Sequence, residues 1–147
     1  MVSAKKYEGF TLIEILVVVG LIAILAAITF IAINPGKNFA DTRNTTRQSD
    51  ATAILNAVTQ YTSEEGNQLS DLGTIPLCTA TPSPIGDGTG NVDLAATLVD
   101  EYIVGIPVDP QTGDDADTGY TICQTTGGRV QIDAPDAENG KVISVKR

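Results

Sequence analysis

Residues 10–33 read FTLIEILVVVGLIAILAAITFIAI, and Glu14 is the only charged residue in this stretch. Residues 15–33 contain no charge at all. As an α-helix they span roughly 28 Å, which is about the thickness of the hydrocarbon core of a bilayer. The stretch therefore predicts one membrane-spanning helix. Lys5 and Lys6 precede it and favour a cytoplasmic start.

The rest of the 147-residue chain is polar and acidic, and its length suits one small globular domain. From Gln48 onward, 15 acidic residues face four basic ones, which leaves a net charge of about −11. Such a surface repels phosphate backbones, so direct binding of nucleic acid is not expected. The sequence has no His, which excludes Ser-His-Asp triads, histidine general bases and His-ligated zinc. We therefore do not expect an enzyme.

A basic segment before an apolar run is also typical of a secretory signal peptide. Here the run is longer than a usual signal core, and no pair of alanines near its end has the A-x-A spacing. A plain signal anchor stays open as an alternative. Glu14 is the informative residue, because a carboxylate driven to the middle of a bilayer costs up to about 3 kcal/mol. Either it lies at the lipid headgroups, or it pairs with a positive charge from another chain.

Residues 5–14, KKYEGFTLIE, resemble the class III leader of type IV pilins and the related pseudopilins. In that family a membrane peptidase cuts after the glycine, on the cytoplasmic side of the apolar run, and the new N-terminal residue is methylated. Matched by position, the resemblance implies that Gly9 ends the leader, that Phe10 is the methylated mature N-terminus, and that Glu14 acts in assembly. It covers about 25 residues.

The apolar helix departs from the family in one respect. Many family members carry a proline well inside this helix, whereas the first proline here is Pro35, just past its end. Local melting at a mid-span proline is therefore not expected, although Gly20 could soften the helix.

A second helical pattern follows the apolar run. Asn34-Pro35-Gly36 predicts a kink rather than a full stop, because helical patterning resumes at once. The spacing of its apolar residues predicts one apolar stripe on this helix, with four charged residues on the opposite face. Gly66 is the expected C-cap. The stripe comprises Ala51, Ile54, Leu55, Val58 and Tyr61 or Thr62, and the charges are Asp41, Arg43, Arg47 and Asp50. A continuous helix from Phe10 to Glu65 would be roughly 84 Å long.

The last part of the chain predicts a small antiparallel sheet. Residues 66–98 are rich in Gly, Pro, Ser and Thr and predict loops; a glycan on residues 79–84 is an open alternative to a plain surface loop. A short helix is expected within residues 93–104. Three strands follow, at residues 120–126, 129–133 and 141–146, with turns at Gly127-Gly128 and Asn139-Gly140.

The predicted fold class is therefore α+β, with a long N-terminal helix packed on a small antiparallel sheet, as the resemblance also implies. We expect a cleaved leader at 1–9 and a membrane or filament-core helix at 10–35. The amphipathic half of the helix is expected at 36–66, and the globular head at 67–147. Three strands have little core of their own, so the helix stripe is needed to cover one face.

Cys78 and Cys123 are the only cysteines. In a domain delivered outside the membrane they favour a disulfide, with two free buried thiols as the alternative. The closed loop would contribute roughly 4 kcal/mol of stability in the chain-entropy description. Zinc is not expected, since two cysteines without histidine cannot complete a site.

Residues 106–120, IPVDPQTGDDADTGY, resemble the Pro-x-Asp-Pro…Gly…Tyr segment of major pseudopilins and some pilins. In several pseudopilins the acidic loop there binds calcium. Asp109, Asp114, Asp115 and Asp117 are candidate calcium ligands, because carboxylate oxygens suit this cation. The EF-hand spacing is missing, and a solvated acidic loop is the favoured alternative.

The function that the resemblance implies is that of a structural subunit of a type IV pilus. Its partners would be copies of itself, the prepilin peptidase, the assembly platform and, before assembly, the membrane. The precursor would cross the cytoplasmic membrane once with its head outside, and the mature protein would lie in a surface pilus. A pseudopilin of a secretion system and a minor pilin for adhesion or DNA uptake are the alternatives; an anchored enzyme has almost no support.

Overall fold

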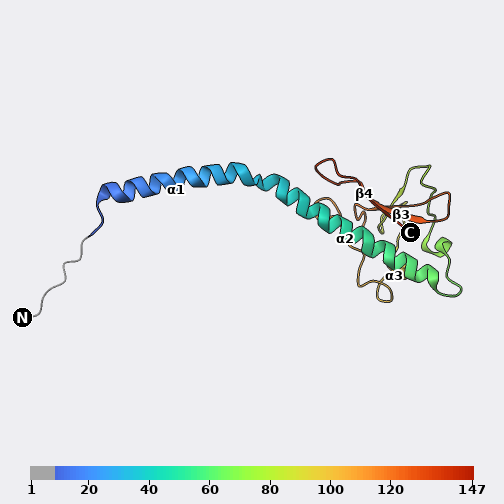
Figure 1. Ribbon diagram of the computed structural model, residues 1–147. Helices are drawn as coiled ribbons and strands as arrows, with labels where there is room; N and C mark the ends of the chain where they lie inside the picture. Colours follow the sequence, from blue (N-terminus) through green and yellow to red (C-terminus); the bar gives the residue numbers. More distant parts are fainter. Residues whose placement is uncertain (1–8) are drawn as a thin grey trace, which may run out of the picture. The chain divides into compact units, whose positions relative to one another are not determined.

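The computed structural model describes residues 9–147, which divide into two compact units (Figure 1). The first unit ends at Asn38 and the second is Phe39–Arg147, the head. Helix α1, Leu12–Ile33, makes up most of the first unit. None of its residues is buried, and among the described residues it lies in the one helical stretch long and apolar enough to cross a membrane.

The expected interruption at Asn34 and Pro35 is confirmed. Asn34 adopts the left-handed conformation, with φ 43°, and helix α2, Pro35–Ser63, starts at the next residue. Pro35 has no N–H to donate, which suits the first position of a helix. The Asn34 Oδ1 accepts a hydrogen bond from the Lys37 N–H at 3.3 Å, and the Asn38 side-chain amide donates to the Ile33 carbonyl at 2.9 Å. The chain therefore ends one helix and caps the next within a single residue.

The head contains a four-stranded antiparallel sheet in the order β1-β2-β3-β4. The strands are β1 Ser83–Pro84, β2 Thr121–Gln124, β3 Val130–Ala134 and β4 Ile143–Lys146. A short 3₁₀-helix, Leu69–Leu72, and α3, Ala95–Leu98, lie in the loop-rich part. The α+β prediction is confirmed, and so are three strands. The sequence missed β1, because two residues ending in a proline carry no alternation, and proline is tolerated only at a sheet edge.

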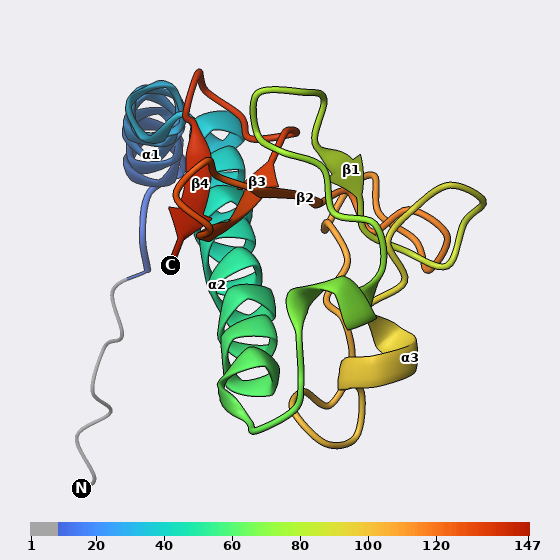
Figure 2. The same cartoon turned by 90° about the vertical axis from the view of Figure 1, so that its right-hand side faces the viewer.

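One face of the sheet packs on α2, as the predicted stripe requires (Figure 2). Every buried apolar residue that α2 contributes to this core has an exposed fraction of 4% or less. They are Ala51, Ile54, Leu55, Ala57 and Val58 from α2, with Tyr120, Ile122, Ile132 and Ile143 from the sheet side. Burying a side chain of this size contributes about 1.5–3 kcal/mol, so α2 and the sheet depend on each other for stability.

The prediction that Arg47 lies on the solvent face of the helix was wrong. Its side chain is fully buried, and Asp50 also faces the head, where it accepts a hydrogen bond from the Tyr120 hydroxyl at 2.8 Å. The buried stripe continues toward the N-terminus of α2 through Ala40, Asn44 and Arg47, at the same helical spacing. The exposed face carries uncharged side chains instead, among them Thr45, Thr46, Ser49, Thr52, Asn56 and Gln60.

Candidate functional site

The start of α1 presents the residues that the sequence assigned to processing and assembly. Gly9 and Phe10 are exposed and precede the helix, and no other part of the described chain would meet a Cβ added at Gly9 within 4 Å. The Gly9–Phe10 peptide bond is therefore open backbone, of the kind that a peptidase can bind in an extended form.

Glu14 folds back over the first turn of α1 and forms a capping box with Thr11. Its Oε2 accepts from the Thr11 N–H at 2.7 Å and from the Thr11 hydroxyl at 2.8 Å, while the Glu14 N–H donates to the Thr11 hydroxyl oxygen at 3.3 Å. This reciprocal bonding satisfies two backbone donors that every helix start leaves free. Within residues 9–147 the partner of Glu14 is therefore neutral, and no ion pair compensates the charge of its carboxylate.

The surface of α1 is apolar on all sides. The exposed fraction of its large apolar residues ranges from 50% at Val17 to 82% at Ile31. Such a surface cannot stay in water, since each apolar side chain left exposed forgoes about 1.5–3 kcal/mol of burial. It must be covered by lipid or by other apolar helices.

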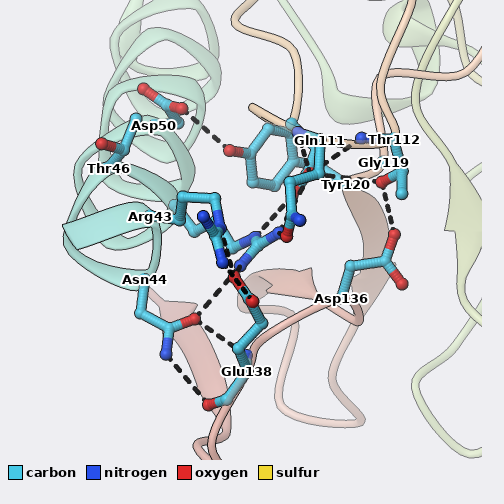
Figure 3. A network of polar contacts seen from close by, with 12 residues as sticks. Arg43, Asn44, Thr46, Asp50, Gln111, Thr112, Gly119, Tyr120, Asp136 and Glu138 are labelled. Atoms are coloured by element: carbon cyan, nitrogen blue, oxygen red, sulfur yellow. Dashed lines mark hydrogen bonds and ion pairs between the residues drawn. The ribbon is translucent and has the colours of Figure 1, made fainter. Parts of the chain in front are cut away.

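The head contains a second organised site, a polar network between α2 and two loops (Figure 3). The buried Arg47 guanidinium binds Asp109 through two hydrogen bonds, Nε to Oδ2 at 2.5 Å and Nη2 to Oδ1 at 3.1 Å. It also donates to Glu138 Oε2 at 2.9 Å and to the Gln111 side chain at 3.2 Å. The side chains of Arg47 and Asp109 have no exposed area.

Both loops are fastened by further bonds of the same carboxylates. Asp109 Oδ1 accepts from the backbone N–H of Gln111 at 2.9 Å and of Thr112 at 3.2 Å. Glu138 accepts from Arg43 with both oxygens, at 2.6 and 2.5 Å. No buried side-chain nitrogen or oxygen among residues 9–147 is left without a partner. The network therefore has the geometry of a structural clamp rather than of a reactive centre.

These contacts shift the pKa values of the network. Hydrogen bonds from Arg43, and then from Arg47, lower the pKa of Glu138 to about 2. Burial alone raises the pKa of Asp109, but the hydrogen bonds from Arg47 and the two loop amides outweigh it and leave that pKa below its ordinary value. The Asp109 hydrogen bond in turn raises the pKa of Arg47. All three groups are therefore charged at neutral pH.

The clamp predicts that acid destabilises the head. A carboxyl group whose pKa is lower in the folded state contributes stability that is complete above its unfolded pKa, about 4, and is lost as the pH falls through the folded value. We expect the melting temperature of the head to be level from about pH 7 to pH 5 and to fall from about pH 4 toward pH 2. Thermal unfolding followed by circular dichroism measures this. In Glu138→Gln the midpoint should be lower at neutral pH and the acid slope shallower; the same slope in both proteins would contradict the assignment.

The four candidate calcium ligands are not brought together. Asp109 is committed to Arg47, as described above. Asp114 Oδ1 accepts from the Asp117 N–H at 2.8 Å, and Asp117 Oδ1 accepts from the Gly119 N–H at 3.0 Å, so these carboxylates order their own turn. Within residues 9–147 no three His, Cys, Asp or Glu side chains are grouped so that they could hold a metal ion. The partner of Asp109 in this structure is the Arg47 guanidinium, and calcium binding by the acidic loop stays a prediction.

Cys78 and Cys123 form a disulfide that joins the loop before β1 to β2. The same segment follows β2 through backbone bonds from the Cys78 N–H to the Gln124 carbonyl and from the Gln124 N–H to the Pro76 carbonyl, both at 2.8 Å. A covalent bond and two hydrogen bonds thus hold an otherwise irregular segment against the sheet.

The clamp is the feature that the sequence analysis missed. Its signal was present, because Ala40, Asn44, Arg47 and Ala51 continue the apolar stripe at intervals of three and four residues. A polar residue in such a row is buried, and a buried Arg requires a carboxylate partner.

Comparison with known proteins gives one result for the N-terminus. Residues 4–30 match the family described as prokaryotic N-terminal methylation motif, which is the motif of class III prepilin leaders in type IV pilins and pseudopilins. No curated protein and no solved structure matches the chain. The motif supports a type IV pilin or pseudopilin family member. It points to a structural subunit that is processed by a prepilin peptidase, and with the apolar helix it is consistent with a membrane-anchored precursor.

Proposed function

From a prepilin leader joined to an unpartnered apolar helix and a disulfide-bonded head, we propose that this protein is the structural subunit of a type IV pilus. The observation that carries the proposal is the surface of α1. It is apolar on every side and exposed throughout, and it follows directly on a leader of the methylation type. Such a helix suits lipid before assembly and the packed centre of a filament afterwards.

The proposed assembly step uses the charges at the start of α1. Cleavage after Gly9 leaves a cationic amine on Phe10, and in an apolar filament centre an unpaired amine or carboxylate is costly. Glu14 of an incoming subunit pairs with the Phe10 amine of the subunit before it, which compensates both charges and fixes the axial register. The apolar side chains of α1 supply nonspecific packing area, so the charge pair contributes specificity more than net affinity.

A pseudopilin of a type II secretion or related system is the second candidate. The observation that favours it is the Pro107–Pro110 segment, which resembles the corresponding segment of major pseudopilins. The two candidates differ in the filament that the subunits form, because a pilus extends from the cell surface and a pseudopilus stays short. Electron microscopy of cells with and without the gene distinguishes them.

Substitution of Gly9 is expected to block maturation. A peptidase must approach the backbone closely at the bond that it cuts, and Gly9→Leu places a side chain in the way. The wild-type protein should start at a methylated Phe10. The Gly9→Leu variant should accumulate at full precursor mass and yield no filaments. Intact-mass spectrometry of the membrane fraction measures both.

Gly20→Ala is the control for Gly9→Leu, because Gly20 lies inside α1 and no other part of residues 9–147 would meet a Cβ there within 4 Å. This variant should be cleaved normally. Wild-type protein cut after residue 25, or Gly9→Leu cut as efficiently as the wild type, would exclude the proposed processing.

A further inference from the structure

Three basic residues gather at one end of the sheet. Val130 and Arg147 exchange two backbone hydrogen bonds, at 2.9 and 3.0 Å, and Lys146 lies opposite Gln131, so that Arg129 and the last two residues share this end. All three side chains are exposed. We call Arg129, Lys146 and Arg147 the basic end of the head.

The basic end has no ion-pair partner within residues 9–147, where all four salt bridges involve other cations. Arg147 donates to the Asn56 side chain at 3.1 Å, which is a neutral partner. Lys141, the remaining cation of the distal chain, differs because its Nζ lies 3.6 Å from Asp41. Three of the four distal cations thus lie at this end of the sheet without an ion-pair partner among residues 9–147.

The opposite end of the sheet is acidic. Strand β2 starts at Thr121, which pairs with Asp133, and ends at Gln124, which pairs with Val130 beside the basic end. The loop that precedes β2 therefore lies at the far end of the strand, about 10 Å away along β2 at the usual rise per residue. This loop and its neighbour carry four exposed carboxylates, Asp87, Asp114, Asp115 and Asp117, which we call the acidic end.

The acidic end is held in a defined position. The Asp87 N–H donates to the Asp115 carbonyl and the Gly88 N–H to the Ala116 carbonyl, both at 3.0 Å. The Asn91 side-chain amide donates to the Ala116 carbonyl at 2.7 Å. A Cβ at Gly86 or Gly88 would collide with that carbonyl, so the two loops are packed backbone to backbone. The negative charges consequently keep a fixed geometry that a partner surface can match.

We propose that the basic end of one head docks on the acidic end of the next copy of this chain, an inference that rests on the proposed pilus function. The two surfaces are different and complementary, so the contact is heterologous, and a heterologous contact that does not close produces an open helical assembly. Each interior subunit uses both ends. The pairs are exposed and individually weak, so they align neighbouring heads and respond to salt, while α1 supplies the packing area.

A second copy suits the basic end better than a polyanion does. The distal chain has a net charge of about −11, which repels nucleic acid or an acidic polysaccharide at distances beyond a single contact. Copies in a filament are held adjacent by their helices, so that the acidic end of a neighbour is present at high effective concentration.

The test is a charge swap in full-length protein, read as the amount of filament sheared from cells at low and moderate salt. Arg129→Glu with Lys146→Glu should reduce the filament yield roughly tenfold, because attraction becomes repulsion at each contact. Asp87→Lys with Asp115→Lys leaves the turn-forming Asp114 and Asp117 in place and makes the acidic end neutral, so the attraction is lost and the yield should fall, but by less. Combining the four changes in one chain removes the repulsion, because the acidic end is then neutral, and should recover part of the yield that Arg129→Glu/Lys146→Glu loses, which a merely structural role would not produce.

Lys141→Glu is the control, since it reverses a distal cation that is already paired within its own chain, and it should leave the yield near the wild-type value. Wild-type yield in the Arg129→Glu/Lys146→Glu variant, or no recovery in the fourfold variant, would overturn the proposal. DNA binding by wild-type filaments that is lost in Arg129→Glu/Lys146→Glu would also overturn the proposal, since the partner of the basic end would then be a polyanion. Wild-type cells without any filament would instead contradict the proposed function itself.

Discussion

Glu14→Gln is expected to eliminate filaments while leaving membrane insertion and cleavage after Gly9 unchanged. Glutamine keeps the acceptor oxygen that the Thr11 N–H and hydroxyl use, so the capping box and the start of α1 survive. Only the negative charge is removed. An incoming subunit then has nothing to offer the Phe10 amine of the subunit before it, and the amine would be buried unpaired, which strongly opposes docking.

Two variants separate the charge of Glu14 from its role as a helix cap. Thr11→Ala removes the hydroxyl that bonds Glu14 but keeps the carboxylate, and it should still assemble. Glu14→Asp keeps the charge on a shorter arm and should be partly defective, because it reaches the amine poorly. Filament yield by electron microscopy, with precursor and mature protein measured on the same cells by immunoblot, compares all three. Filaments of normal register built only from Glu14→Gln subunits would show that the charge does not align the chains.

Arg47→Ala is expected to destabilise the head by about 3–5 kcal/mol, because it leaves the Asp109 carboxylate buried without its cation. For a domain of this size each kcal/mol corresponds to roughly 4–8 °C in melting temperature, so the variant is expected to be unfolded or nearly so at growth temperature. Thermal melting of residues 39–147 measures the loss.

Arg43→Ala is the matched control for Arg47→Ala. Both arginines bind Glu138, but the Arg43 side chain is 29% exposed whereas that of Arg47 is not exposed at all, so the loss should be much smaller. Asp109→Asn tests the pair from the other side, since the amide oxygen still accepts from the loop amides of Gln111 and Thr112. The double variant Arg47→Ala/Asp109→Asn should lose less stability than the sum of the losses of the two single variants, because each change removes the charge that the other leaves unpaired. Simple additivity would mean that Arg47 and Asp109 do not act as a pair.

The parts of the fold that could be predicted are those with a repeating pattern. The length and uniform apolarity of residues 15–33 suffice for a spanning helix, and the alternation at Val130 and Ile132 suffices for a buried strand. The interruption at Asn34-Pro35 could be predicted because proline and a left-handed asparagine act locally. Each of these features is encoded by residues that are close together in the chain.

The parts that could not be predicted depend on contacts between distant residues. Arg47 and Asp109 are 62 positions apart, and nothing near Asp109 shows that a guanidinium from α2 will reach it. An acidic loop was therefore interpreted as a cation site, when one of its carboxylates binds a cationic side chain of the same molecule. Strand β1 is a similar case, since Ser83 and Pro84 are strand residues only because β2 lies beside them.

The most direct test of the pilus-subunit assignment is mass spectrometry of surface filaments sheared from cells that express this chain. We expect filaments whose main component is this protein, starting at an N-methylated Phe10, retaining residues 10–33 and carrying the Cys78–Cys123 disulfide. Surface filaments that lack the chain, or a secreted form that has lost residues 10–33, would contradict it.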